Sequence, residues 1–157
     1  MEKTRTIRYR EFESMAELSP ELRRLMEAAI AAADTAYAPY SQFHVGSALL
    51  LADGTVVSGS NQENVAYPSG LCAERTALFA AAAQHPGVAA VHLCVVARDT
   101  EGRLTEASPC GACLQVMAET RRRQSDPIGV TLWLQGGRLR QFDDIDSLLP
   151  FAFSLGE

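Results

Sequence analysis

The chain contains 157 residues, 47% of them hydrophobic and 21% charged, with a formal net charge of −5; this favours one globular domain, residues 1–157, with a sizeable core. The negative charge argues against a general nucleic-acid surface, which needs a basic field to attract phosphates. The longest apolar stretch free of charged residues, residues 43–52, is too short to span a bilayer.

The first eighteen residues lack the apolar core of a secretory signal, so we expect the protein to stay in the cytoplasm. We expect them to form an N-terminal arm or an edge strand, the strand covering residues 7–12. The first helix is predicted to begin after Ser19, a favourable N-cap, with Pro20 at the first helical position. Apolar residues at helical spacing extend this helix to about residue 37, before Pro39 stops it.

Two strand-like runs follow the first helix, at residues 45–52 and residues 55–60. They are joined by Asp53-Gly54, the strongest short hairpin signal in the chain, because Asp and Gly tolerate the positive φ angles of a tight turn. We therefore predict that the two strands pair as an antiparallel hairpin.

Helical and strand-like segments alternate in the second half of the chain. Residues 72–83 are rich in Ala and predict a helix that is ended by the breaker at residues 85–87. Residues 111–123 predict another helix, and residues 88–97 and 128–135 predict buried strands. The order α-β-β-α-β-α-β, followed by a tail, indicates an α/β protein of three α-β-α layers, with helices on both faces of a central mixed sheet that begins with the hairpin.

The cysteines indicate a metal site, because thiols in a reducing cytoplasm serve metal binding or catalysis more often than disulfides. Cys72, Cys110 and Cys113 each stand near a predicted loop-to-helix junction, where the helix N-terminus favours thiolate over thiol. Zinc takes soft ligands in tetrahedral geometry, and three protein ligands leave the fourth position for water, as in a catalytic site. Cys94 lies in a Val-rich predicted strand and is expected to be a small buried hydrophobic residue.

Glu74 follows Cys72 by two residues at the start of the same predicted helix. Its carboxylate is expected to reach a water molecule at the open zinc position without binding the metal, which suits a proton shuttle. Zinc deaminases use this chemistry, with Cys or His plus two Cys on zinc, a Glu as acid and base, and attack of water on an amino-bearing ring carbon. The alternative is a carboxylate that only stabilises the helix N-terminus.

Nearly the whole chain after residue 19 resembles the small homotetrameric cytidine deaminases of the three-cysteine zinc type. The matching segments, in the order and spacing of that family, are residues 36–46 (AYAPYSQFHVG), 61–64 (NQEN), 72–77 (CAERTA), 108–113 (SPCGAC) and 148–150 (LLP). The resemblance implies hydrolysis of cytidine and deoxycytidine to uridine and deoxyuridine with release of ammonia, one zinc ion per subunit, and a place in pyrimidine salvage. His44 stands where many family members carry proline, a departure that bears on the rigidity of the neighbouring loop.

The resemblance also implies how the substrate is bound. Asn61 and Glu63 are expected to hydrogen-bond the ribose hydroxyls, to which an amide and a carboxylate offer complementary groups. Phe43 is expected to pack against the pyrimidine ring, the Ala73 amide to lie near the base carbonyl oxygen, and the Ser108 carbonyl to lie near the amino group. The alternatives are a strand-end cap for the Asn and Glu pair and a plain core residue for the phenylalanine.

The resemblance implies roles for two further residues, Phe153 and Arg75. Phe153 is similar to a C-terminal aromatic residue that is supplied to a neighbouring subunit's site; the alternatives are that Phe151 takes this role or that Phe153 is a plain core residue. Arg75 is implied to contact Cys72 or its zinc-binding neighbour. Three thiolates on a doubly charged zinc leave a net negative centre, and a guanidinium withdraws charge from a thiolate by hydrogen bonding. The alternative for Arg75 is a surface arginine that pairs within its own helix.

Other functions account for only part of these residues. A blasticidin-type deaminase shares the zinc motif but usually lacks the carboxylate that Glu63 provides. A polynucleotide deaminase needs a basic groove, and the only basic run, residues 121–123, falls near a predicted helix C-terminus, where the dipole favours cations. A structural zinc module needs a fourth ligand such as a histidine or Cys94, and a redox dithiol at residues 110–113 leaves Cys72 unexplained.

Overall fold

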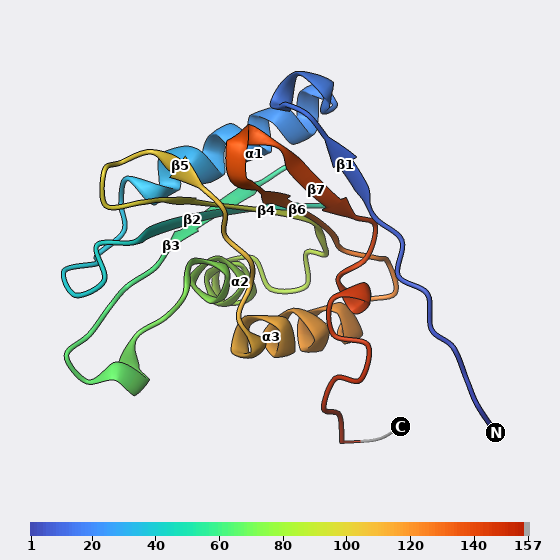
Figure 1. Cartoon of the computed structure of the whole chain (residues 1–157). Coiled ribbons are helices and arrows are strands. Elements are labelled where there is room, and N and C mark those ends of the chain that lie inside the picture. Colours follow the sequence, from blue (N-terminus) through green and yellow to red (C-terminus); the bar gives the residue numbers. More distant parts are fainter. Residues whose placement is uncertain (156–157) are drawn as a thin grey trace.

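The computed structural model describes residues 1–155 and shows three layers in this part of the chain (Figure 1). Helix α1 (Pro20–Ala33) covers one face of a mixed sheet, and helices α2 (Ala73–Gln84) and α3 (Gly111–Arg122) cover the other. This arrangement confirms the predicted α/β fold with helices on both faces of the sheet. Within residues 1–155, no helix combines the length and the apolar character that a membrane crossing requires.

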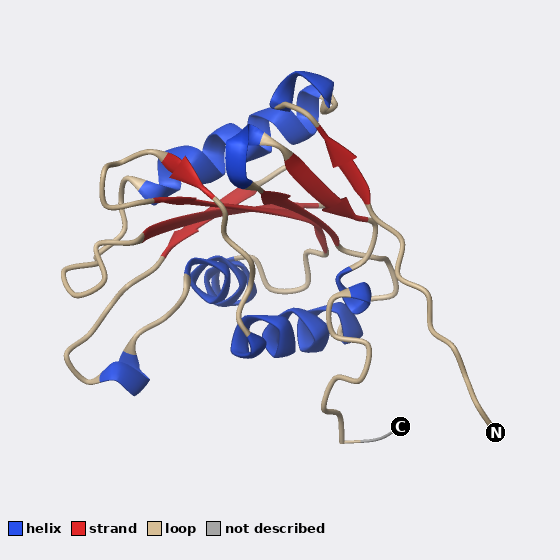
Figure 2. Cartoon of the chain, viewed as in Figure 1, coloured by secondary structure: helices blue, strands red, loops and turns tan. Residues whose placement is uncertain are grey.

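The strands, drawn in red in Figure 2, form one sheet with the order β1-β7-β6-β4-β2-β3, and the short β5 pairs with β4 outside this order. Parallel pairing joins β4 to β6, whereas the other neighbouring strands are antiparallel. The strands are β1 (Arg10–Phe12), β2 (His44–Leu51), β3 (Val56–Ser60), β4 (Ala90–Arg98), β5 (Leu104–Thr105), β6 (Gly129–Trp133) and β7 (Leu139–Phe142). Helices α2 and α3 lie on the same face of this sheet, and their N-termini are close together.

The predicted hairpin is confirmed by the antiparallel pairing of β2 with β3, in which Gly46 lies opposite Ser60 and Leu50 opposite Val56. Gly54 has a φ of 86°, a left-handed conformation that costs glycine little. The amide of Thr55 donates to Asp53 Oδ1 at 2.9 Å, so both residues of the Asp-Gly signal take part in the turn. The local sequence is therefore sufficient to place this turn.

Helix α1 begins as predicted but ends earlier. Ser19 Oγ accepts a hydrogen bond from the amide of Leu22 at 3.3 Å. The expected end near residue 37 is wrong, because the helix stops at Ala33. The Tyr37 amide donates to the Asn61 carbonyl at 3.0 Å, which draws the chain away from the helix axis and alongside the segment that follows β3. This early end leaves the loop before β2 in a position to line a cavity.

Two strands were not predicted, β5 and β7. The segment after residue 135 was expected to be a tail, but it returns as β7, which pairs with β6 after a turn at Gly136 and Gly137, both at positive φ. The strand predicted at residues 128–135 is correspondingly shorter, since β6 ends at Trp133. The expected N-terminal edge strand is present as β1, which adds to the outer side of β7, but it covers only Arg10–Phe12 of the predicted residues 7–12.

Among the described residues, the buried apolar side chains form one cluster on the α1 side of the sheet and another between the sheet and α2 and α3. Glycines allow the helices to lie directly on the strands. A Cβ atom at Gly46 would stand 2.0 Å from the Ala29 carbonyl oxygen, and one at Gly59 would stand 2.5 Å from the Ala73 carbonyl oxygen. Any side chain at Gly59 would therefore displace the first turn of α2.

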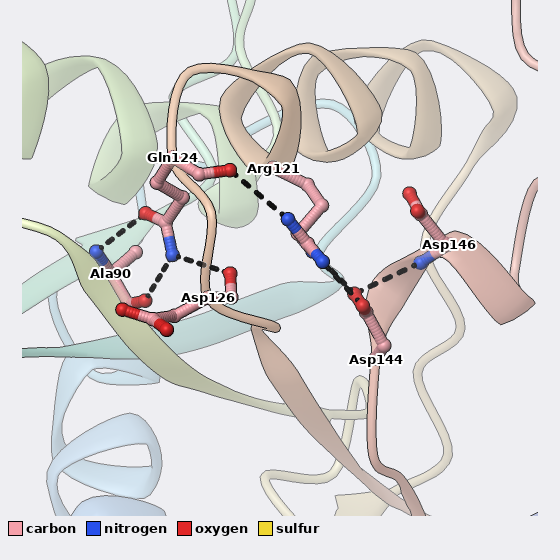
Figure 3. Close-up of polar contacts among 6 residues, drawn as sticks. All are labelled: Ala90, Arg121, Gln124, Asp126, Asp144 and Asp146. Carbon is pink, nitrogen blue, oxygen red and sulfur yellow. Dashed lines mark hydrogen bonds and ion pairs between the residues drawn. The ribbon is translucent and has the colours of Figure 1, made fainter.

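The C-terminal end of α3 is held by a polar network that the sequence did not reveal (Figure 3). Gln124 forms two hydrogen bonds with the backbone of Ala90, from Nε2 to the carbonyl at 2.8 Å and from the amide to Oε1 at 2.9 Å. Arg121 Nε lies 2.9 Å from Asp144 Oδ2. The basic run at residues 121–123 does fall at a helix C-terminus, and its first member links that helix to the segment after β7.

We expect Gln124→Ala to lower the free energy of unfolding by about 1–3 kcal/mol, because it leaves buried backbone groups of Ala90 without partners. Urea denaturation measures this change. Gln84→Ala is the matched control, since Gln84 is exposed at the last position of α2. Equal denaturation midpoints for the two variants would contradict the stabilising role of Gln124.

Candidate active site

Three thiols meet where α2 and α3 begin. Cys72 is the N-cap of α2, Cys110 is the N-cap of α3, and Cys113 lies in the first turn of α3. Their sulfur atoms lie within 4.8 Å of one another, with 3.8 Å between Cys72 Sγ and Cys110 Sγ and 3.6 Å between Cys110 Sγ and Cys113 Sγ. Thiolates at a Zn–S distance of about 2.3 Å in tetrahedral geometry stand about 3.8 Å apart, so the spacing fits zinc.

The electrostatics of the cluster favour a thiolate. The pKa of Cys72 is lowered to about 5, chiefly by its hydrogen bond with Cys113 and also by Arg75 and Cys110. The pKa of Cys113 is raised, chiefly by its hydrogen bond with Cys72 and by burial. A negative sulfur is thus available at the helix N-termini, whose dipoles also favour negative charge.

Glu74 is a buried carboxyl group beside these sulfurs. It lies in the first turn of α2, and only 3% of the residue is exposed. Burial raises its pKa, and the nearby charge of Cys72 raises it further. A carboxyl group in this environment takes up a proton more readily than one in water, which is the property that a general acid and base needs.

Arg75 lies beside the thiols, from the same helix turn. Its Nη2 is 3.5 Å from Cys72 Sγ, and the hydrogen bond to that sulfur raises the pKa of the guanidinium. The side chain therefore places a positive charge against a sulfur of the cluster, instead of pairing with a carboxylate of its own helix.

One cavity, of about 470 Å³, contains most of the residues that the sequence singled out. Its wall includes Phe43, Asn61, Glu63, Cys72, Glu74, Arg75, Ser108 and Cys110. The wall also includes residues to which the sequence gave no role, among them Ser41, Tyr67, Leu71 and Glu106. Ser41 stands inside the AYAPYSQFHVG segment, whereas no sequence signal distinguishes Glu106. The volume falls within the range of small-molecule sites.

Asn61 and Glu63 hold the loop at residues 40–45 against the cavity. Asn61 Oδ1 accepts from the Val45 amide at 2.8 Å, and its Nδ2 donates to the Phe43 carbonyl at 2.9 Å. Glu63 Oε1 accepts from the amides of residues 40 and 41 at 3.0 and 3.1 Å, and Oε2 accepts from the Ser41 hydroxyl. These contacts with their own chain were not foreseen from the sequence.

Two predicted substrate contacts lie outside the cavity wall. Ala73 is fully buried at the first position of α2, where its amide has no partner within the helix, while its carbonyl accepts from the Ser47 hydroxyl at 2.8 Å. Phe153 is 70% exposed, and its backbone is held by Gln115 of α3. Phe151 is 91% exposed, so neither aromatic ring is buried within its own described chain.

Cys94 is fully buried in β4 and packs in the cluster on the α1 side of the sheet, whereas Cys113 packs on the other side. Burial raises the pKa of Cys94 to about 12, so this thiol stays neutral. The expectation of a small buried residue is confirmed. Within residues 1–155, the group of Cys, His, Asp and Glu side chains close enough to hold a metal contains only Cys72, Cys110 and Cys113. A structural zinc module with four protein ligands therefore finds no support in the described chain.

Several known proteins with related sequences are cytidine deaminases. The model of the cytidine and deoxycytidylate deaminase zinc-binding region matches residues 19–125. Cytidine deaminase of Halalkalibacterium halodurans is 50% identical over 133 residues, which are 83% of this chain and 92% of the relative. Cytidine deaminase of Sporosarcina psychrophila is 48% identical over 99 residues, which are 63% of this chain and 69% of the relative.

Solved structures agree with this relationship. The crystal structure of cytidine deaminase from Burkholderia pseudomallei has a TM-score of 0.71 and 43% identity, and the match covers 83% of this chain and 97% of that one. Cytidine deaminase from Mycobacterium tuberculosis has a TM-score of 0.66 and 34% identity, with 87% and 100% of the two chains covered. Zinc is the cofactor for which the three thiols are arranged. The chain belongs to the cytidine and deoxycytidylate deaminase family defined by this zinc-binding region.

Proposed function

We propose that the protein hydrolyses the exocyclic amino group of cytidine and deoxycytidine and releases uridine or deoxyuridine and ammonia. One observation carries the proposal: the buried carboxyl group of Glu74 lies beside a three-thiol zinc cluster, in a cavity that also contains Phe43, Asn61 and Glu63. The relatives named above, which are cytidine deaminases, support the choice of substrate.

In the mechanism, Cys72, Cys110 and Cys113 hold the metal. Bound zinc supplies Lewis-acid activation, lowering the pKa of a water molecule to about 7. Glu74 accepts a proton from the attacking water and delivers it to N3 of the base, while the C4–O bond forms. Glu74 then takes the remaining proton from the new C4 hydroxyl and delivers it to the amino group, the C4–N bond breaks as the C4=O bond forms, and ammonia leaves. The raised pKa of Glu74 suits both the acceptance and the return of the proton.

The remaining cavity residues bind the nucleoside in this proposal. Phe43 packs against the pyrimidine ring, the Ala73 amide meets the base carbonyl oxygen, and the Ser108 carbonyl meets the amino group. Asn61 and Glu63 bind the ribose hydroxyls. Asn61 Nδ2 has two N–H donors and uses one on Phe43, while the Glu63 carboxylate offers about four acceptor positions and uses three. One donor of Asn61 and one acceptor position of Glu63 thus remain for the sugar, beside the second acceptor position of Asn61 Oδ1.

We propose a homotetramer in which Phe153 contributes to a neighbouring subunit's site. The exposed ring of Phe153, on a backbone anchored to Gln115, supports this role. Phe153→Ala is expected to raise KM for cytidine, and light scattering measures whether the tetramer still forms. Unchanged kinetics would mean that Phe151 has this role or that neither phenylalanine has it.

We place the enzyme in the cytoplasm, where thiols stay reduced, and in the salvage of pyrimidine nucleosides.

The test of the proposed function is the loss of ultraviolet absorbance of cytidine, on protein with measured zinc content, with ammonia release as a second readout. Zinc-loaded protein is expected to consume cytidine and deoxycytidine. Blasticidin and single-stranded DNA containing cytosine are the comparison substrates. If the zinc-loaded protein leaves both nucleosides untouched, the proposed substrate is wrong.

Arg75→Gln is expected to retain zinc in part and to lower kcat about 10- to 100-fold, because the thiolate then keeps the charge that the guanidinium withdraws. Steady-state kinetics at matched zinc content measure the effect. Arg24→Gln is the control, since Arg24 is exposed on α1. An unchanged kcat in Arg75→Gln would exclude an electrostatic role for this residue.

A further inference from the structure

The loop that carries Phe43 depends on hydrogen bonds for its shape. Residues 40–45 contain no proline, and Gln42 has a φ of 54°, a left-handed conformation that is strained for a residue with a side chain. Phe43 is 37% exposed and lines the cavity. One backbone hydrogen bond, from the Gln42 amide to the Ala38 carbonyl at 2.9 Å, closes this turn, and side-chain contacts hold the peptide groups of Phe43.

Ser41 supplies one of these contacts through a hydroxyl group that bonds in two directions. Its Oγ donates to Glu63 Oε2 and accepts from the Phe43 amide at 3.1 Å. The hydroxyl thus connects the Glu63 carboxylate, in the segment after β3, to the backbone of Phe43. An alanine at this position would break both links and leave the Phe43 amide without its acceptor.

The Phe43 peptide groups are held from both sides. The amide bonds to Ser41, and the carbonyl accepts from Asn61 Nδ2 at 2.9 Å. Asn61 and Glu63 are the two residues proposed to bind the ribose. The sugar contacts and the aromatic contact therefore belong to one hydrogen-bonded unit, in which Ser41 joins Glu63 to Phe43.

We infer that Ser41 is a positioning residue, which couples the Glu63 carboxylate to Phe43 so that the surfaces proposed to contact the sugar and the base are set together. This inference rests on the proposed function for its kinetic consequences. The pKa of Glu63 is lowered, chiefly by its hydrogen bond from the Ser41 side chain, so Glu63 accepts this bond as a charged carboxylate. Glu74 and the thiols come from other elements, so the chemical step is expected to depend little on Ser41.

Ser41→Ala is expected to raise KM for cytidine about tenfold and to change kcat less than about threefold, as for the loss of a hydrogen bond to a charged group. Ser41→Thr keeps the hydroxyl and is expected to restore KM to within about threefold of the parent value. Ser125→Ala, at an exposed position after α3, is the matched control and is expected to leave both constants unchanged. A lower melting temperature with unchanged KM would reduce Ser41 to a structural role and overturn the inference.

A double-mutant cycle with Glu63→Gln tests the coupling itself. If Ser41 acts through Glu63, adding Ser41→Ala to Glu63→Gln is expected to raise KM by much less than tenfold, whereas full additivity contradicts the inference. Hydrogen exchange of the Phe43 amide provides a readout that needs no activity. Exchange is expected to be about tenfold faster in Ser41→Ala than in the parent and in Ser41→Thr. Faster exchange in a protein that is inactive toward cytidine would support the positioning and reject the proposed substrate, while unchanged exchange would reject the positioning.

Discussion

Glu74→Gln is expected to lower kcat for cytidine by about 10³-fold while the protein keeps its zinc and its fold, since general acid and base catalysis contributes about 10²- to 10⁴-fold. The residue is 3% exposed, lies beside the three sulfurs, and is not among the side chains grouped closely enough to hold the metal. Gln has the same shape but cannot accept or return a proton at neutral pH. The expected loss therefore lies in kcat more than in KM.

The stability of this variant separates catalysis from folding. Burial raises the pKa of Glu74, so its charged form is less favourable in the folded chain than in the unfolded one at pH values above the unfolded pKa. The neutral amide avoids that cost, and we expect Glu74→Gln to melt at a temperature no lower than the parent. Glu119→Gln, exposed on α3, is the control for the change of charge. Full activity in zinc-loaded Glu74→Gln would remove the proton shuttle from the mechanism.

Cys110→Ala is expected to lose most of the bound zinc and, with it, deaminase activity. Only two of the three thiols then remain, and a catalytic zinc site needs three protein ligands. Cys110 is exposed, so the substitution removes a metal ligand with little effect on core packing. The measurements are zinc per subunit by elemental analysis and cytidine turnover on the same sample. The melting temperature is also expected to fall, because zinc that binds the folded chain stabilises it.

Cys94→Ala is the matched control, with the opposite pattern of effects. Cys94 is fully buried in β4 and keeps a neutral thiol, so its truncation costs packing but no metal ligand. We expect one zinc per subunit and lowered stability in this variant. Zinc retained by Cys110→Ala, or lost from Cys94→Ala, would show that the metal is held by a different set of residues.

Short-range chemistry made several features of this protein predictable from its sequence. The cap at Ser19, the turn at Asp53-Gly54 and the starts of α2 and α3 each depend on residues within a few positions of one another. The three-cysteine pattern was equally readable, because a helix N-terminus favours thiolates wherever the helix lies. These local signals sufficed to predict a mixed sheet between helices and a zinc centre.

The features that the sequence did not reveal depend on partners far apart in the chain. Helix α1 ends early because Tyr37 bonds to Asn61, and the supposed tail becomes β7 because it completes the sheet beside β6. Asn61 and Glu63 were interpreted as sugar contacts, with a strand-end cap as the alternative, whereas their side chains hold a loop that lies some twenty residues away in sequence.

The sequence by itself determined which chemical groups this protein carries and which short segments begin helices and turns, because these depend on neighbouring residues. Only the tertiary structure decided that the sulfur atoms of Cys72 and Cys110, thirty-eight residues apart in sequence, lie 3.8 Å from each other. The same holds for the hydrogen bonds by which Ser41 joins Glu63 to Phe43. The physical reason is that such contacts form only after tertiary structure has brought distant segments together. Packing of α2 and α3 on the sheet does this for the thiols, and pairing of β2 with β3 does it for Ser41, Phe43 and Glu63. The conformational preferences of neighbouring residues do not determine which distant segments come into contact.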